Sequence, residues 1–226
     1  MTNTLHRYGS RESLQDDYVV FAIPSVGIND KGAQEKLRTF LRTAIKYHPV
    51  NMGEGAKGSL FRPSKSLTLF NTYLGKRRHT VPLEQVADGV NDPGTVAAVF
   101  NNRQAMEKFV EEVRKLDLGI SVNVSALVEE TRQSCHNLGF CPHSVEYSLG
   151  FRGKTEKLAT GRVLELTTMC GHSMVSPHLA QKMIDHVKEG RQTPERASTF
   201  MAKFCTCGVF NVSRAKRLLE AAKISD

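Results

Sequence analysis

The residues with the clearest chemical potential are the cysteines and histidines of the C-terminal part of the chain. Five of the eight histidines lie there, together with every cysteine: Cys135, Cys141, Cys170, Cys205 and Cys207. Thiolate sulfur and imidazole nitrogen are the ligands that zinc and iron–sulfur clusters favour in proteins. This concentration predicts a metal-binding or iron–sulfur site in a cysteine-rich C-terminal region.

The Cys-x-Cys pair, Cys205 and Cys207, is expected where a helix ends. Inside a regular helix the two side chains would point to nearly opposite sides. Gly208 follows immediately, and glycine readily takes the left-handed conformation that terminates a helix. Both thiols can then turn toward one centre.

Cys170 and His172 are expected between a strand and a helix. The apolar run Val163–Thr168 predicts a strand that ends just before them, and a helix is expected to begin just after them. In layered α/β folds this crevice collects binding groups, and the helix dipole stabilises thiolates there. The hypothesis of a single site requires that Cys170 lies close to Cys205 and Cys207 in the folded protein.

The preferred ligand set is Cys170, Cys205 and Cys207, with Cys141, Cys135 or His172 as the fourth ligand. Three thiolates with an open or non-cysteine fourth position suit a [4Fe–4S] cluster that binds substrate, or a zinc ion that activates water. The motif CHNLGFCPH carries Cys135 and Cys141, but its spacing matches neither zinc knuckles nor ferredoxins. We therefore expect a metal-binding or iron–sulfur protein. A further hypothesis is that this protein is an enzyme that acts on a small anionic substrate.

Two alternatives use the same residues. The protein is a metal-free enzyme with Cys170 as nucleophile and His172 as base, because thiolates form readily at helix N-termini. Or it is a basic nucleic-acid-binding module with structural cysteines, in keeping with its net charge of +8 and its basic stretch 62–79. Its aromatic residues are Phe70 and Tyr73, neither lies within the dense basic run 76–79, and no RNA-binding signature is present, which disfavours nucleic acid as the partner.

Composition limits the class of protein. The 226 residues are 40% hydrophobic and 24% charged, as in ordinary globular proteins, and no stretch approaches the roughly 20 apolar residues of a membrane span. The N-terminus has no apolar signal core. These features predict a cytoplasmic protein with reduced thiols and no membrane partner.

The elements that must position the site alternate along the chain. Tyr18–Pro24 reads as a buried strand and Ala33–Tyr47 as an amphipathic helix, whereas residues 49–93 form the least ordered stretch. Further strands are expected at 67–73, 95–100, 120–125, 144–149 and 163–168, and further helices at 102–116, 126–137, 177–188, 194–206 and 212–223.

This alternation predicts an α/β or α+β fold with a helix-covered mixed sheet. The β-α-β-α-β run Thr95–Leu149 fits a ferredoxin-like sandwich or a small parallel sheet, and periodicity leaves both open. The expected organisation is a polar tail (1–17), an α/β domain (18–150), and a C-terminal strand with a helical subdomain (151–226) that carries the Cys/His site.

Overall fold

The computed structural model describes residues 7–54, 58–59, 62–63, 82–91 and 93–224. Within these residues one sheet has the strand order β4-β3-β2-β5-β1-β6, and every pairing is antiparallel. Val20 in the middle of β1 lies opposite Ala98 of β5 and Val124 of β6. The strands are β1 (Tyr18–Ile23), β2 (Asn51–Glu54), β3 (Gly58–Ser59), β4 (Arg62–Pro63), β5 (Val96–Phe100) and β6 (Ser121–Ser125).

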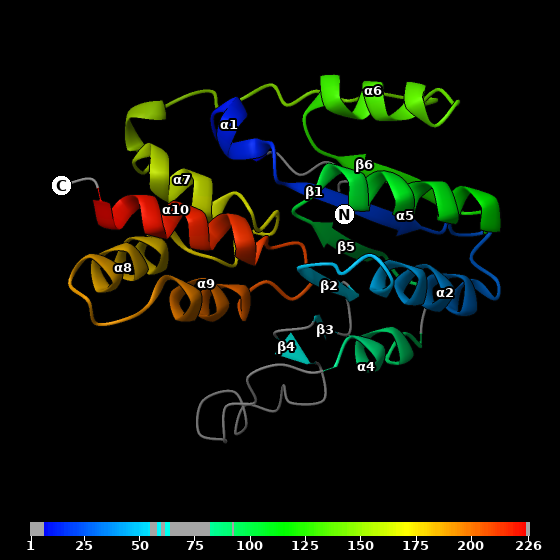
Figure 1. The fold of residues 1–226 in the computed structure, drawn as a ribbon, viewed down its shortest axis with the longest axis horizontal. Helices are drawn as coiled ribbons and strands as arrows, with labels where there is room; N and C mark the ends of the chain where they lie inside the picture. The colour runs from blue at the N-terminus through cyan, green and yellow to red at the C-terminus, as the bar shows by residue number, and fades with distance from the viewer. Residues whose placement is uncertain (1–6, 55–57, 60–61, 64–81, 92, 225–226) are drawn as a thin grey trace.

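The two faces of the sheet pack against different helices, because successive strand side chains point to opposite sides. Val20 and Ala98 belong to one apolar core with helices from the first half of the chain, whereas Val19 and Val99 belong to a second core with the C-terminal helices. The first group is α2 (Ala33–Ile45), α4 (Leu83–Asp88) and α5 (Arg103–Leu116), and the second is α7 (Gly161–Thr167), α8 (Pro177–Lys188), α9 (Pro194–Ala202) and α10 (Val212–Ile224). Figure 1 shows the sheet between these two helical layers.

The predicted starts of α8 and α9 are confirmed by their caps. Ser176 Oγ accepts a hydrogen bond of 3.2 Å from the backbone N–H of Leu179, and Thr193 Oγ1 accepts one of 3.3 Å from that of Arg196. A proline follows each cap at the first helical position, where its missing N–H costs nothing. The Ser176 cap fixes the direction in which the chain leaves the loop that carries Cys170.

The predicted parallel βαβαβ core is wrong, because the sheet is antiparallel throughout its described strands. The strand expected at 144–149 is absent, and those residues are exposed without regular structure after the remaining helix of this half, α6 (Val128–Asn137). The sheet instead contains β2, which lies within residues 49–93, the stretch that the sequence predicts to be least ordered. A four-residue strand with buried Asn51 and Glu54 has no apolar alternation by which to recognise it.

The strand predicted at Val163–Thr168 is also wrong, since this segment forms helix α7. Val163 and Leu166 are both buried three residues apart, which is a helical spacing, but so short an apolar run fits either structure. The C-terminal region therefore contains helices and no strand within its described residues; α9 ends at Ala202, earlier than expected. The strand expected at 67–73 lies outside the described residues, and the proposed division at residue 150 stays a prediction.

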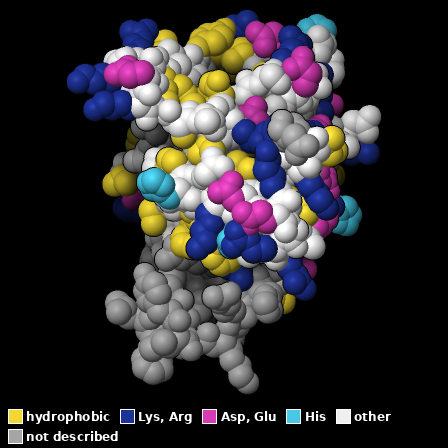
Figure 2. Space-filling view, turned by 90° about the vertical axis from the view of Figure 1, so that its left-hand side faces the viewer, with side chains coloured by type: hydrophobic (Ala, Val, Ile, Leu, Met, Phe, Trp, Pro, Cys, Tyr) yellow, Lys and Arg dark blue, Asp and Glu magenta, His cyan; other side chains and the backbone are white. Residues whose placement is uncertain are grey.

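The described N-terminal residues include a short helix, α1 (Arg11–Leu14), and a single 3-10 turn, η2 (Thr155–Lys157), precedes α7. Searching the described residues for a helix long and apolar enough to cross a bilayer finds none. Figure 2 shows the face that carries the C-terminal helices, where Lys and Arg side chains alternate with Asp and Glu.

The loop between α9 and α10 lies directly on the sheet. Gly208 has a φ of +72°, and a Cβ atom there would lie 2.4 Å from the carbonyl carbon of Met52 and 2.5 Å from the backbone nitrogen of Gly53. Two residues later, the side-chain amide of Asn51 donates a 2.9 Å hydrogen bond to the carbonyl oxygen of Phe210. The backbone that follows Cys207 therefore packs directly on the backbone of β2.

We predict that Gly208→Ala destabilises the protein by about 3–5 kcal/mol, because a left-handed alanine and an unavoidable clash with β2 act together. Gly190→Ala is the matched control: Gly190 has a φ of +69° but open space around it, so we expect a loss of about 1–2 kcal/mol. Urea denaturation measures both. Equal losses would mean that the loop does not depend on its contact with β2.

Candidate functional site

Three cysteine thiols and one histidine meet beside the sheet. Cys205 Sγ and Cys207 Sγ are 3.8 Å apart, and Cys207 Sγ is 3.5 Å from Nδ1 of His172. Cys170 joins this cluster through a side-chain hydrogen bond with Cys205. The predicted meeting of Cys170 with the Cys-x-Cys pair is therefore confirmed as geometry. We call these four residues the cysteine cluster.

Two loops bring the cluster together. The first follows α7, where the N–H of Cys170 donates to the carbonyl of Thr167 and the chain turns through Ser173, with a φ of +56°, before α8 begins. Cys170 therefore follows a helix, and the strand-end position inferred for it is wrong. The loop still ends at the capped N-terminus of α8, as expected.

The second loop follows α9. The N–H of Cys205 bonds to the carbonyl of Ala202, the last residue of that helix, and the N–H of Gly208 reaches back to the carbonyl of Cys205 at 3.5 Å. Both cysteines thus lie in turns beyond the helix, and Gly208 has the left-handed conformation expected of it. This non-helical backbone lets the two thiols point to the same place.

The cluster is sheltered from water on its sulfur side. Cys170, Cys205 and Cys207 are 3%, 0% and 6% exposed, whereas His172 is an exposed residue. The thiols belong to the apolar core that includes strands β1 and β5. The imidazole is consequently the side from which solvent or a small molecule reaches the sulfur atoms.

Hydrogen bonds among the three thiols give them different pKa values. The bond with Cys205, followed by burial, raises the pKa of Cys170 far above its ordinary value. The bond with Cys170 lowers the pKa of Cys205, but the bond with Cys207 and burial outweigh it and raise the pKa to about 12. The bond with Cys205 lowers the pKa of Cys207. The cluster alone therefore favours one thiolate, on Cys207, because further buried negative charges repel one another.

A buried ion network lies next to the cluster. Asp17 Oδ2 is 3.0 Å from Nη1 of Arg7 and 2.9 Å from Nη1 of Arg214, and all three side chains are at most 5% exposed. Nη2 of Arg7 also donates to the carbonyl of Val209. Sequence reasoning missed this network, since Arg7 and Asp17 were assigned to a polar tail and their partner Arg214 lies 197 residues beyond Asp17.

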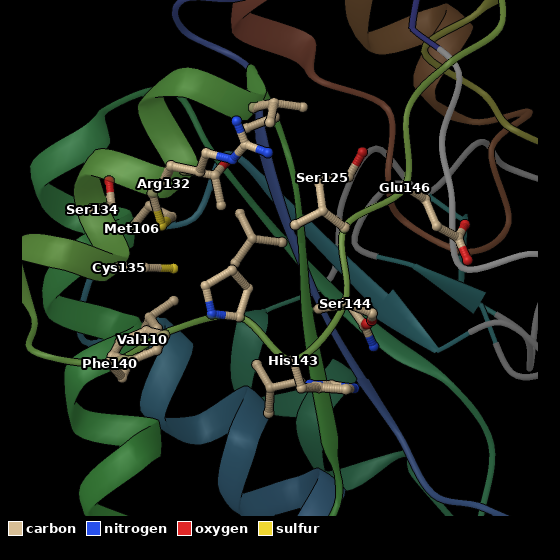
Figure 3. A pocket seen from close by; sticks show the side chains of 18 of the residues that line it. Met106, Val110, Ser125, Arg132, Ser134, Cys135, Phe140, His143, Ser144 and Glu146 are labelled. Atoms are coloured by element: carbon tan, nitrogen blue, oxygen red, sulfur yellow. The ribbon is translucent and has the colours of Figure 1, made fainter.

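The motif CHNLGFCPH lies elsewhere. It lines a cavity of about 840 Å³ between β6, α5, α6 and residues 138–148, a volume typical of small-molecule sites. Figure 3 shows the thiol of Cys135 pointing from α6 into the cavity. Cys141, a predicted ligand, also lines it and is exposed, and α6 lies far from α8 and α9 in Figure 1. The structure does not bring this motif to the cysteine cluster.

The cavity has apolar and polar walls. Val110 and Met106 of α5 lie on one side, whereas His143 and Ser144 lie across from them, and Arg132 is at one end (Figure 3). Nη2 of Arg132 donates a 2.5 Å hydrogen bond to the hydroxyl of Tyr147. Arg7 and Asp17 also line the cavity, and Arg7 interacts electrostatically with Cys205 and Cys207, so the ion network borders both the cavity and the cysteine cluster.

No group of three or more His, Cys, Asp or Glu side chains within the described residues has the arrangement of a ready-made metal site. Comparison of the chain with protein-family models, with curated proteins and with solved structures finds no match.

We predict that brief treatment with iodoacetamide under native conditions modifies Cys141 and spares Cys170 and Cys205. Cys141 is exposed, whereas the other two thiols are buried and have raised pKa values, so little nucleophilic thiolate is available. Peptide mass spectrometry quantifies each site, and the same treatment in urea should modify all five cysteines. Rapid native modification of Cys205 would contradict the buried position of the cluster.

Proposed function

We propose that the protein is a metal-binding protein in which Cys170, Cys205, Cys207 and His172 hold one tetrahedral ion of the zinc class. The observation that carries this proposal is the pair of distances within the cysteine cluster. With Zn–S bonds of about 2.3 Å and Zn–N bonds of about 2.0–2.1 Å, a tetrahedron has S···S edges of about 3.8 Å and S···N edges of about 3.6 Å. The corresponding separations are 3.8 Å and 3.5 Å.

The surroundings of the sulfur atoms favour the same conclusion. The backbone N–H of Val209 hydrogen-bonds to Cys205 and Cys207, and the N–H groups of His172 and Met174 bond to Cys170; each bond lowers the pKa of its thiol. N–H donors of this kind stabilise thiolate ligands. A bound cation would also remove the mutual repulsion that keeps two of the three thiols protonated.

An iron–sulfur centre is the second form of this proposal. A [4Fe–4S] cluster held by Cys170, Cys205 and Cys207 would retain one iron for substrate. Its sulfur ligands would have to stand farther apart than the 3.8 Å between Cys205 and Cys207, because each cysteine binds a different iron. The zinc-class ion needs the smaller rearrangement and is preferred for that reason.

A small anionic molecule is the proposed substrate or ligand. The neighbouring cavity has a suitable volume, and Arg7 both lines it and acts electrostatically on Cys205 and Cys207. We also propose that the sheet half of the chain is a ferredoxin-like sandwich, since β1, α2, β2, β5, α5 and β6 occur in the order β-α-β-β-α-β, with β3, β4 and α4 inserted between β2 and β5. The proposed setting is cytoplasmic, where the thiols stay reduced.

We predict that protein purified without oxygen or chelators contains about one zinc per chain, measured by inductively coupled plasma mass spectrometry. Cys205→Ser should lower the content by tenfold or more, because it removes a thiolate from the centre of the cluster. Cys141→Ser is the matched control, since Cys141 is exposed on another part of the molecule, and should keep the wild-type content. Equal metal content in both variants, or none in the wild type, would refute the proposed centre.

A metal-free thiol enzyme is the competing proposal, and its best observation is the 3.5 Å contact between Cys207 and His172. The structure pairs the imidazole with Cys207, whose pKa is lowered, rather than with Cys170, whose pKa is raised. The geometry thus favours Cys207 as the nucleophile of this alternative, in place of the Cys170 first considered. The nucleic-acid alternative rests mainly on stretch 62–79, of which only residues 62–63 are described.

The pH dependence of thiol modification separates the two proposals. In metal-free protein, modification of Cys207 by a small methanethiosulfonate should begin below the ordinary cysteine pKa of about 9 and fall away as the pH drops through its lowered pKa, whereas Cys205 should react only near pH 12. Under the metal proposal, added zinc suppresses the reaction of Cys207 throughout the pH range in which its thiolate reacts. Unchanged reactivity of Cys207 with zinc present would favour the thiol enzyme.

A further inference from the structure

The ion network beside the cysteine cluster carries more positive than negative charge. The carboxylate of Asp17 is shared by the guanidinium groups of Arg7 and Arg214, so these three side chains, each at most 5% exposed, together carry one excess positive charge. Burying an uncompensated charge is expensive unless an opposite charge lies nearby. The excess therefore calls for an anion.

The excess is located on Arg7. Arg214 is well satisfied, because its guanidinium also donates to the backbone oxygen of Tyr8 at 2.7 Å and to Ser13 Oγ at 3.0 Å. In contrast, Nε and Nη1 of Arg7 are buried and have no hydrogen-bond acceptor among the residues that the structure describes, although Nη1 is within ion-pair distance of Asp17. Arg7 is thus the member of the network that still needs negative charge.

The cysteine cluster lies close to Arg7. Nη2 of Arg7 binds the carbonyl oxygen of Val209, while the N–H of the same residue bonds to the sulfur atoms of Cys205 and Cys207. Both thiols act electrostatically on the Arg7 charge, which also feels Asp17 and Arg214. The half-buried carboxylate of Glu165 lies near Arg214, across Gly9.

We propose that Arg7 is the built-in counter-ion of the cysteine cluster and that the cluster takes a cofactor which leaves it with a net charge of about −1. A divalent ion with three thiolates and a neutral imidazole has this charge, and so does a [4Fe–4S]²⁺ core with three thiolates. A centre with one thiolate fewer would be neutral and would leave Arg7 uncompensated. Arg7 acts through the ligands and is a positioning residue, and the inference rests on the proposed metal centre.

The test uses two substitutions that change the network charge in opposite directions. Arg7→Gln removes the excess positive charge, whereas Asp17→Asn increases it and keeps an Oδ1 acceptor for the side chain of Asn211. Full-length variants are titrated anaerobically with Co²⁺, followed by the visible absorption of the tetrahedral ion, and Zn²⁺ competition gives the affinity. A merely structural network would weaken binding in both variants.

We expect Arg7→Gln to weaken metal binding by about 10- to 100-fold, the range seen when groups that support metal ligands are removed, and Asp17→Asn to strengthen it. Arg7→Lys retains the charge and should stay closest to wild type, which keeps the test decisive if Asp17→Asn does not fold. Arg217→Gln is the control for overall charge, because Arg217 pairs with Asp16 at the surface, and should have no effect.

The outcomes separate the two claims. Weaker binding in both Arg7→Gln and Asp17→Asn, or equal weakening in Arg7→Gln and Arg7→Lys, would overturn the counter-ion while leaving the metal centre in place. Absence of tetrahedral Co²⁺ binding by the wild-type protein would overturn the proposed function and the counter-ion with it. Opposite shifts in the two variants, with no change in Arg217→Gln, are the supporting result.

Discussion

The contact of Gly208 with β2 is the constraint on which the site depends. Only a glycine lets the backbone after Cys207 lie against the backbone of Met52 and Gly53. This contact anchors the loop between α9 and α10 on the sheet, and it places Cys205 and Cys207 in the core that the C-terminal helices share with β1 and β5. The cluster is therefore a product of docking one half of the chain on the other.

The docking of the C-terminal half of the chain on the sheet also explains why charged side chains are buried here. The same loop continues to Asn211, whose side chain bonds to Asp17 Oδ1 at 3.0 Å and accepts from the N–H of Arg214 at the start of α10. The carboxylate of Asp17 in turn forms ion pairs with Arg7 and Arg214. Thiol cluster, helix start and ion network are thus one connected structure, in which negative charge at the sulfur atoms would balance the positive charge beside them.

Local signals in the sequence predicted the local structure well and the long-range structure unevenly. The caps Ser176 and Thr193 and the left-handed Gly208 follow from short-range chemistry. The run Val163–Thr168 fits a strand and a helix equally well, so its pattern does not predict α7. The pattern does not predict β2 either, because polar Asn51 is buried there through its bond to Phe210. The meeting of Cys170 with Cys205 was predictable from residue type, whereas the role of Arg7 depends on partners far away in sequence.

The coordination shell of the purified protein tests the central claim most directly. Extended X-ray absorption fine structure at the zinc edge, recorded on protein isolated without chelators, should show three sulfur neighbours at about 2.3 Å and one nitrogen at about 2.0–2.1 Å. A shell of oxygen and nitrogen only, or four sulfur atoms, would contradict a centre built from Cys170, Cys205, Cys207 and His172.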